Sequence, residues 1–198
     1  VIGSSCIGAS VLGGVCNNSG GALVRRGPAY TEMALYARVN ESGELQLINH
    51  LGIDLGNTAE EILTRLQTQD YEMGQVTTQT SQLASDNRYA HDVKQVDADS
   101  PARFNADPTR LYEASGSAGK VCVFAVRLDT FEKVESKVFY IGSNDHDDLT
   151  AIRRYLLTSL PSLPIAGEYI HRDAFSIGAK YGKDTFLFIE RFGTVNIP

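Results

Sequence analysis

Two stretches of alternating apolar and polar residues, 31–40 and 44–50, stand out in the first third of the chain. One side of the first stretch carries Met33, Leu35, Ala37 and Val39, and the other side carries Tyr36 and Arg38. Ser42 and Gly43 supply a tight turn between the two stretches. Because successive side chains of a strand point to opposite faces, the pattern predicts a β-hairpin with one buried face.

Apolar residues at helical spacing, together with helix start signals, predict five helices. Thr58 followed by Glu61 is a capping box before an apolar run. Asp145 and its acidic neighbours suit the positive end of a helix dipole. Asp107 followed by Pro108 is typical of an N-cap and a first helical position. The predicted helices are 8–16, 59–69, 107–113, 149–160 and 172–180.

Runs rich in β-branched and aromatic residues predict further strands. Residues 121–128 are expected to form a buried strand. After a charged crossover at 133–137, the runs 138–141, 165–170 and 185–189 alternate with the last two predicted helices. This order predicts a second, βαβαβ unit, and we place the boundary between the two units near residue 130.

The segment from residue 70 to residue 100 differs from the rest of the first unit. It is dominated by Gln, Thr, Ser and Asp and shows no sustained period. A loop of this length is uncommon inside a compact domain. We therefore expect a polar excursion on the surface, partly disordered at most.

Overall composition limits the function classes. Of the 198 residues, 42% are hydrophobic and 21% are charged, which is typical of globular domains. The net charge of −6 without a basic stripe argues against nucleic acid as a partner. No apolar run reaches the roughly 18 residues of a membrane span, and no secretory signal is recognisable. Cys6, Cys16 and Cys122 lack metal-ligand spacing, so we expect a reducing cytoplasmic environment and no metal site.

The first 21 residues contain the strongest chemical signal. They hold six glycines and five serine or alanine residues, with no charge among them. Small side chains let a flat or anionic group approach the backbone, whose N–H groups then serve as donors. One interpretation is therefore a nucleotide-cofactor cradle, and the alternative is a tightly packed helix of small residues. Residues 8–13 lack the second glycine of the G-x-G-x-x-G fingerprint, so a nicotinamide Rossmann site is not expected.

Other candidate residues give weaker signals. The four histidines, His50, His91, His146 and His171, are scattered and are expected to be surface or satisfied side chains. Arg172, beside His171 and Asp173, could pair with a ligand carboxylate, although a charge cluster at a helix start is the simpler interpretation. Cys6 has no charged neighbour that would activate its thiol, so a packing role is favoured. No residue is assigned as a catalytic base.

Several longer motifs together resemble one family. The chain carries Ile-Gly-Ser-Ser-Cys-Ile-Gly-Ala-Ser at 2–10, Asn-His-Leu-Gly-Ile-Asp-Leu-Gly at 49–56 and Pro-Ala-Arg-Phe-Asn-Ala-Asp-Pro at 101–108. It also carries Phe-Ala-Val-Arg-Leu-Asp-Thr-Phe at 124–131 and Ala-Gly-Glu-Tyr-Ile-His-Arg-Asp at 166–173. These runs, which spare residues 68–95, resemble the quinone-dependent D-lactate dehydrogenases, FAD enzymes of the inner face of the bacterial cytoplasmic membrane.

The resemblance implies an α+β fold similar to the vanillyl-alcohol-oxidase type of flavoprotein. Residues 1–130 would be the second subdomain of the FAD-binding domain, and residues 131–198 would begin an α+β cap domain. By the same resemblance, FAD contacts fall on Gly3, Ser10, Gly20 and Val123. Arg172 is the candidate for orienting the substrate carboxylate.

The implied reaction is the oxidation of D-lactate to pyruvate. A hydride passes from the substrate Cα to flavin N5, a base takes the hydroxyl proton, and a membrane quinone receives the electrons. The first residue is not Met and the last apolar run lies close to the chain end, so we expect a piece of a longer protein. The pyrophosphate-wrapping loop would precede Val1 and the membrane-contacting segments would follow Pro198. We therefore expect weak FAD binding or none by this piece alone.

Two alternatives remain at this point. The first is an FAD oxidoreductase of another 2-hydroxy acid such as glycolate. The second is a non-catalytic domain that kept the fold and lost the cofactor.

Overall fold

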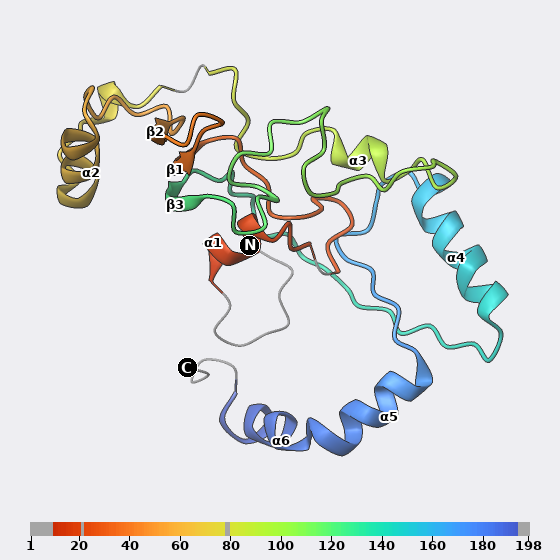
Figure 1. Cartoon of the computed structure of the whole chain (residues 1–198). Helices are drawn as coiled ribbons and strands as arrows, with labels where there is room; N and C mark the ends of the chain where they lie inside the picture. Colours follow the sequence, from red (N-terminus) through yellow and green to blue (C-terminus); the bar gives the residue numbers. More distant parts are fainter. Residues whose placement is uncertain (1–9, 21, 78–79, 194–198) are drawn as a thin grey trace.

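Three segments of the described residues form an antiparallel sheet (Figure 1). The structure is a computed structural model that describes residues 10–20, 22–77 and 80–193. Strand β1 (Ala34–Val39) lies between β2 (Leu45–Asn49) and β3 (Cys122–Val126). Tyr36 is paired with Ile48 on one side and with Val123 on the other. The predicted hairpin and the strand at 121–128 are thus confirmed, within a residue or two at their ends.

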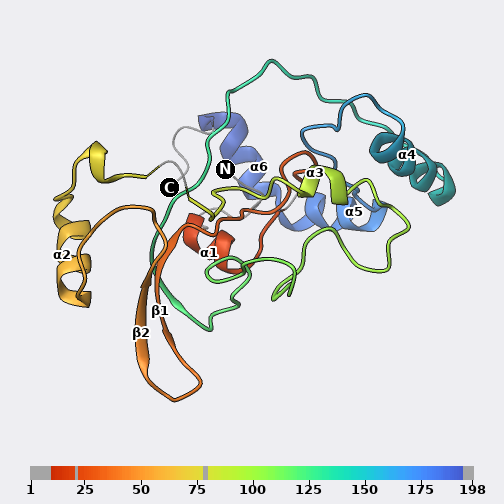
Figure 2. The same ribbon diagram turned by 90° about the horizontal axis from the view of Figure 1, so that it is seen from above.

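The first half of strand β1 is buried on both faces, whereas Arg38 and Val39 at its end are exposed, so the expectation of a single buried face was wrong. Leu35 packs in one apolar cluster with Ile62 of helix α2 (Ala59–Thr68). Tyr36 packs in the opposite cluster with Val15 of helix α1 (Val11–Cys16). Figure 2 shows the hairpin between these two helices. Alternate side chains of β1 therefore pack into two cores, one on each side of the sheet.

Strand β3 is less buried than its sequence suggested. Phe124 is 42% exposed and Cys122 is also exposed, because β3 is an edge strand. The register against β1 is irregular between Leu35 and Tyr36. The expectation of a buried strand is therefore corrected: only part of β3 contacts the cores.

Four predicted helices are confirmed, and each of them begins at a side-chain cap. Ser10, Thr58 and Asp145 accept hydrogen bonds from the third or second N–H of α1, α2 and α4 (His146–Thr158). The capping box at α2 is only half formed, because Glu61 accepts from the Asn57 N–H rather than from Thr58. Helix α5 spans Arg172–Tyr181. Residues 8 and 9 of the first predicted helix lie outside the described residues.

The helix predicted at 107–113 does not form. The Asp107 carboxylate accepts hydrogen bonds from both the main-chain N–H and the hydroxyl of Thr109, at 2.9 and 2.7 Å. The Arg110 N–H bonds to the Asp107 carbonyl, which closes a turn. An aspartate satisfies a turn in the same way as a helix N-terminus, so the local signal could not separate the two.

The predicted βαβαβ unit is wrong in all three of its strands. Residues 138–141 are extended but unpaired, and their side chains are 59% to 96% exposed. Residues 165–170 contribute one isolated bridge, from Ala166 to Leu23. Residues 185–189 lie inside helix α6 (Lys183–Phe192). A strand needs a neighbouring strand for its hydrogen bonds, and none is offered to these segments by the described residues.

The polar segment 70–100 is largely irregular. It contains a 3-10 turn (Met73–Gln75) and the short helix α3 (Tyr89–Asp92). Main-chain hydrogen bonds fix it to the residues next to the sheet: the Thr77 N–H donates to the carbonyl of Gly52, after β2, and the Glu32 N–H, before β1, donates to the carbonyl of Leu83, each at 2.7 Å. Outside residues 78–79, the excursion is therefore anchored to the body by its own backbone.

Helices α4, α5 and α6 lie outside the sheet and its two flanking helices (Figure 1). They follow the segment from Arg127 to Gly142, which forms no helix or strand. The chain returns to the body at 163–167, where Val24 and Gly167 donate main-chain hydrogen bonds to Ile165 and Ala22. The domain boundary near residue 130 stays a prediction.

Candidate functional site

Helix α1 is fixed against the segment that leads into β3. The side chain of Val15 is fully buried beside Tyr36 and Ala114. The Gly116 and Ala118 N–H groups donate to the carbonyls of Val15 and Cys16, both at 3.0 Å. The turn at 114–120 therefore joins the C-terminal end of α1 to the start of β3, and it brings two of the predicted cofactor segments together.

The predicted FAD-contacting residues have different surroundings. Ser10 is exposed, and its hydroxyl accepts from the Gly13 N–H at 2.9 Å. A Cβ added at Gly20 would meet Pro28 at 3.1 Å, so Pro28 fills the space beside this glycine. Val123 is half-buried on the edge strand β3 and packs against the Val15 cluster. Gly3 lies outside the described residues.

These surroundings fit a flavin group at two of the three described positions. An edge strand has one row of peptide groups that faces away from its neighbour, and on β3 no strand of the described residues pairs with that row. The exposed Ser10 stands on α1, which contacts β3. At Gly20 the packing of Pro28 favours the alternative interpretation, in which the glycine permits close packing of the chain on itself.

Arg172 is not brought near these residues. It is the first residue of α5, its side chain is 88% exposed, and its Nε atom lies 3.4 Å from Asp173. His171 is the N-cap of α5 and accepts from the Asp173 N–H at 3.1 Å. The charge cluster at a helix start, which the sequence offered as the simpler interpretation, is what the structure contains.

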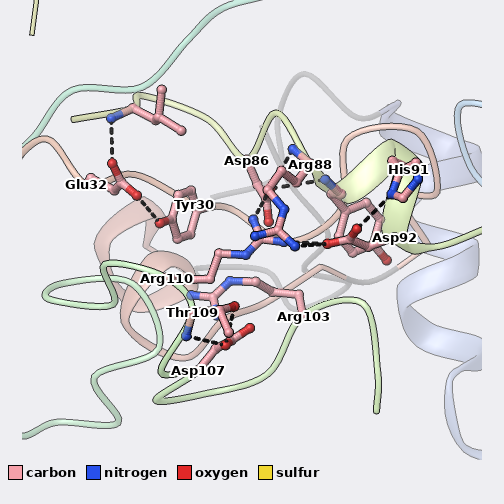
Figure 3. Close-up of polar contacts among 12 residues, drawn as sticks. Tyr30, Glu32, Asp86, Arg88, His91, Asp92, Arg103, Asp107, Thr109 and Arg110 are labelled. Atoms are coloured by element: carbon pink, nitrogen blue, oxygen red, sulfur yellow. Dashed lines mark hydrogen bonds and ion pairs between the residues drawn. The ribbon is translucent and has the colours of Figure 1, made fainter. Parts of the chain in front are cut away.

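A second polar cluster, which the sequence did not reveal, surrounds two buried arginines (Figure 3). The Arg110 side chain is 6% exposed and forms ion pairs with Asp86 and, at 2.8 Å, with Asp92. Arg103 is 7% exposed and lies 4.8 Å from the centre of the Tyr30 ring. The aspartates come from the polar segment 70–100, so this segment supplies counter-charges to residues 101–110.

The electrostatics of this cluster follow from its burial. Burial lowers the pKa of Arg103, although Tyr30 and Asp86 act in the opposite direction. Burial and the hydrogen bond to Glu32 raise the pKa of the Tyr30 hydroxyl. The hydrogen bond from His91, assisted by Arg88 and Arg110, lowers the pKa of the Asp92 carboxyl. The cluster thus favours the charged forms of Arg110, whose pKa the Asp86 carboxylate raises, and of Asp92, whereas burial disfavours the charged form of Arg103.

Another ionic contact involves His50. Its Nδ1 atom lies 2.7 Å from the Glu113 carboxylate, and the His50 side chain is 33% exposed. Glu113 precedes Ala114 of the α1 core, and burial together with Glu113 raises the pKa of the Tyr36 hydroxyl. The expectation of a satisfied histidine is confirmed for His50. Its partner stands 63 positions away, and no local pattern could have found it.

Residues 101–108, which form part of the family resemblance, also line a cavity. This run was noted for its family resemblance, and it contributes Phe104 and Asp107 to a cavity of about 330 Å³. The walls opposite carry Arg88 and Asp92. Among the described residues, no group of three or more His, Cys, Asp or Glu side chains could hold a metal ion.

Comparisons with known proteins cover the whole chain. Residues 138–198 match a family model described as "D-lactate dehydrogenase, membrane binding". The resemblance led us to expect the membrane-contacting segments beyond Pro198, whereas this match lies inside the chain. Within the described ranges, no helix combines the length and the apolar character needed to cross a membrane.

Full-length matches to curated proteins agree with the family model. The chain is 65% identical over its entire length to a quinone-dependent D-lactate dehydrogenase of Haemophilus influenzae and 59% identical to that of Escherichia coli. A Corynebacterium glutamicum protein of the same name is 50% identical over 96% of the chain. The chain spans 33% to 35% of the length of these relatives. It is therefore similar along its length to the quinone-dependent D-lactate dehydrogenases and corresponds to about a third of such a protein.

Proposed function

We propose that the chain is part of an FAD-dependent dehydrogenase that oxidises D-lactate to pyruvate and passes the electrons to a membrane quinone. The observation that carries this proposal is the 65% identity over the entire chain to a curated enzyme of that name. Identity at this level leaves little room for a different substrate class. The protein as a whole is the enzyme, and this third of it supplies part of the cofactor site.

The cofactor contribution is assigned to the described surface of α1 and β3. Ser10 and the main chain at Val123 would contact FAD, and Gly3 would allow it to approach its peptide group, whereas Gly20 is assigned to close packing against Pro28. When bound, FAD supplies the redox chemistry by accepting a hydride from the substrate. The residues of this chain hold and orient the cofactor, and the pyrophosphate-binding loop comes from another part of the protein.

The membrane contribution is assigned to the last third of the chain. The family model described as membrane binding covers helices α5 and α6. These helices expose apolar side chains, among them Phe175, Tyr181 and Leu187. Short amphipathic helices of this kind lie in the interface of a bilayer rather than across it. The protein would therefore be peripheral, on the cytoplasmic face of the bacterial inner membrane.

The substrate test uses the full-length protein with a soluble quinone analogue as acceptor. D-lactate should support quinone reduction with a kcat/KM at least about a hundredfold above that of glycolate or L-lactate. A preference for glycolate would favour the other 2-hydroxy acid oxidoreductase. Purified full-length protein without flavin, and without any activity after FAD is added, would favour the non-catalytic domain.

Arg172 is the candidate for binding the lactate carboxylate. Removing a charged partner of a substrate carboxylate should raise KM more than it lowers kcat when the contact is made equally in ground and transition states. We expect Arg172→Gln in the full-length protein to raise the KM for D-lactate about tenfold or more. Arg153→Gln, at a neighbouring helix, serves as the control. An unchanged KM removes Arg172 from the site.

The piece by itself should bind FAD weakly. Titration of the 198-residue chain with FAD, followed by flavin fluorescence, should show no saturable binding at micromolar concentration. A stable yellow complex of this chain alone would contradict the proposal that a separate loop is needed for the pyrophosphate.

A further inference from the structure

Arg103 has a feature that neither the family nor the proposed reaction explains. It is 93% buried, because only 7% of its surface is exposed, and its Nε and Nη2 atoms have no hydrogen-bond partner among the described residues. Its Nη1 atom donates to the adjacent Phe104 carbonyl at 2.5 Å. Buried polar groups in proteins are nearly always paired, so an unpaired guanidinium edge calls for a partner.

The two unpaired atoms lie on the same edge of the guanidinium group. The N–H bonds of Nε and of Nη2 point in the same direction, and together they form the fork that receives two oxygens of one carboxylate or phosphate. The Tyr30 ring lies beside the guanidinium group, and the Phe104 carbonyl occupies the remaining nitrogen. Arg103 is thus held in place while its bidentate edge stays unused.

The aspartates nearby are already committed. One Asp86 oxygen accepts from Arg110 and from the N–H groups of Arg88 and Tyr89. Asp92 pairs with Arg110 and with His91. Asp107 accepts both hydrogen bonds of Thr109. None of these aspartates accepts a hydrogen bond from the Nε or Nη2 atom of Arg103 among the described residues. The second oxygen of Asp86 is also buried there without a partner.

A cavity lies near this residue, although Arg103 itself is not one of its lining residues. The 330 Å³ cavity is walled by Ala102 and Phe104, which flank Arg103 in the sequence, and by Arg110, which lies close to Arg103 in Figure 3. Ligand cavities of small molecules begin at about this size. The cavity lining carries two arginines, Arg88 and Arg110, and two aspartates, Asp92 and Asp107, so its formal charges balance and the unused edge of Arg103 is what favours a negatively charged occupant.

We propose that the Nε–Nη2 edge of Arg103 binds one oxyanion, a carboxylate or a phosphate, in a bidentate manner beside this cavity. The oxyanion has two sources of the same chemistry. It is either a small free anion that enters the cavity, or a carboxylate side chain from the two-thirds of the protein that these 198 residues do not include. The proposal is independent of the substrate and the cofactor assigned above.

The experiment is a thermal-shift and calorimetric titration of the full-length protein with inorganic phosphate and with acetate. Arg103→Gln removes the fork, Arg103→Lys keeps the charge without the fork, and Arg88→Gln is the control. Arg88 lines the same cavity, but its side chain is 58% exposed. A free-anion site predicts saturable binding by the wild type and by Arg88→Gln, weakened about tenfold or more in Arg103→Gln and only partly restored in Arg103→Lys.

A second outcome of the same experiment would show that the oxyanion is a carboxylate side chain of the protein itself. In that case no added anion binds, yet Arg103→Gln lowers the melting temperature of the full-length protein clearly more than Arg88→Gln does, and Arg103→Lys does not restore it. A double-mutant cycle with Asp86→Asn then shows no coupling beyond additivity.

Two results overturn the proposal. One is the absence of anion binding together with equal melting temperatures of the Arg103→Gln and Arg88→Gln variants. The other is strong coupling between Arg103→Gln and Asp86→Asn, because it would show that Arg103 pairs within this cluster and needs no further oxyanion.

Discussion

Apolar side chains are buried in the body, which comprises the sheet with helices α1 and α2, but are exposed in the segment after residue 130. In the body, the apolar residues of β1 contact α1 on one side and α2 on the other, and Leu35 and Tyr36 are fully buried. After residue 130, equally apolar runs such as 138–141 remain exposed. Since the chain spans about a third of its relatives' length, the difference indicates that the body contains most of its own packing partners and the later segment does not.

The largest expected effect separates the two cores from the exposed run. Leu35→Ala leaves a cavity in a fully buried site and should lower the free energy of unfolding by about 4 kcal/mol. Phe139→Ala removes a side chain that is 79% exposed and should change it by less than about 0.5 kcal/mol. Urea unfolding of the chain measures both. Equal losses would mean that residues 138–141 are packed.

The same two variants, Leu35→Ala and Phe139→Ala, can be compared by their free energies of unfolding in the full-length protein. There we expect Phe139→Ala to become destabilising, because the remaining two-thirds of the protein would cover it. If Phe139→Ala stays neutral in the full-length protein, the exposed run serves another purpose than packing within the protein.

A second contrast uses one type of ion pair in both regions. Asp86 is fully buried beside Arg110, so Asp86→Ala leaves a buried guanidinium group partly unpaired and should cost about 3 kcal/mol. Asp97 and Arg154 form a bidentate pair of the same chemistry, but their side chains are 75% and 46% exposed. Asp97→Ala should therefore produce no resolvable loss in thermal unfolding. A large loss would show that α4 is docked through this pair.

A smaller effect concerns acid stability, which the body should determine. The folded-state pKa values of Asp92 and Asp107 are lowered, so their stabilisation is present above their ordinary pKa and is lost as the pH falls through the folded-state values. Stability of the body should therefore decrease as the pH drops below about 4. Asp92→Asn should flatten this decrease, measured by urea midpoints at several pH values. Asp173→Asn, on exposed α5, should leave the slope unchanged.

The smallest effect should be the same in both regions. Thr58 and Asp145 are side-chain N-caps of α2 and α4. A cap acts on the first turn of its own helix, so alanine at either position should cost about 1 kcal/mol. Far-UV circular dichroism during thermal unfolding would detect it. A cap effect confined to α2 would mean that α4 is not a stable helix in this chain.

These contrasts explain what the sequence could predict. Helices make their hydrogen bonds within one segment, so start signals at Thr58 and Asp145 sufficed to locate α2 and α4. Strands depend on a partner, and the prediction held for 34–39 and 45–49, where a turn of five residues joins the partners. It failed for 138–141 and 185–189, where the described residues offer no neighbouring strand.

The polar sites were less predictable for a related reason. Arg103 and Arg110 are close in sequence to Asp107, but their surroundings come from Tyr30, Asp86 and Asp92. The pairing of His50 with Glu113 joins two segments that are 63 positions apart in the sequence. Composition signalled only that small residues gather near the start of the chain, and it could not distinguish an exposed Ser10 from a Gly20 covered by Pro28.

The central claim is that the flavin rests against α1 and β3 and not against the later helices. Hydrogen–deuterium exchange of the full-length protein, with FAD removed and then restored, tests it most directly. The account predicts that FAD slows exchange in residues 10–20 and 122–126 and leaves α4, α5 and α6 unchanged. Protection confined to the later helices, or none in either of the two predicted segments, would contradict it.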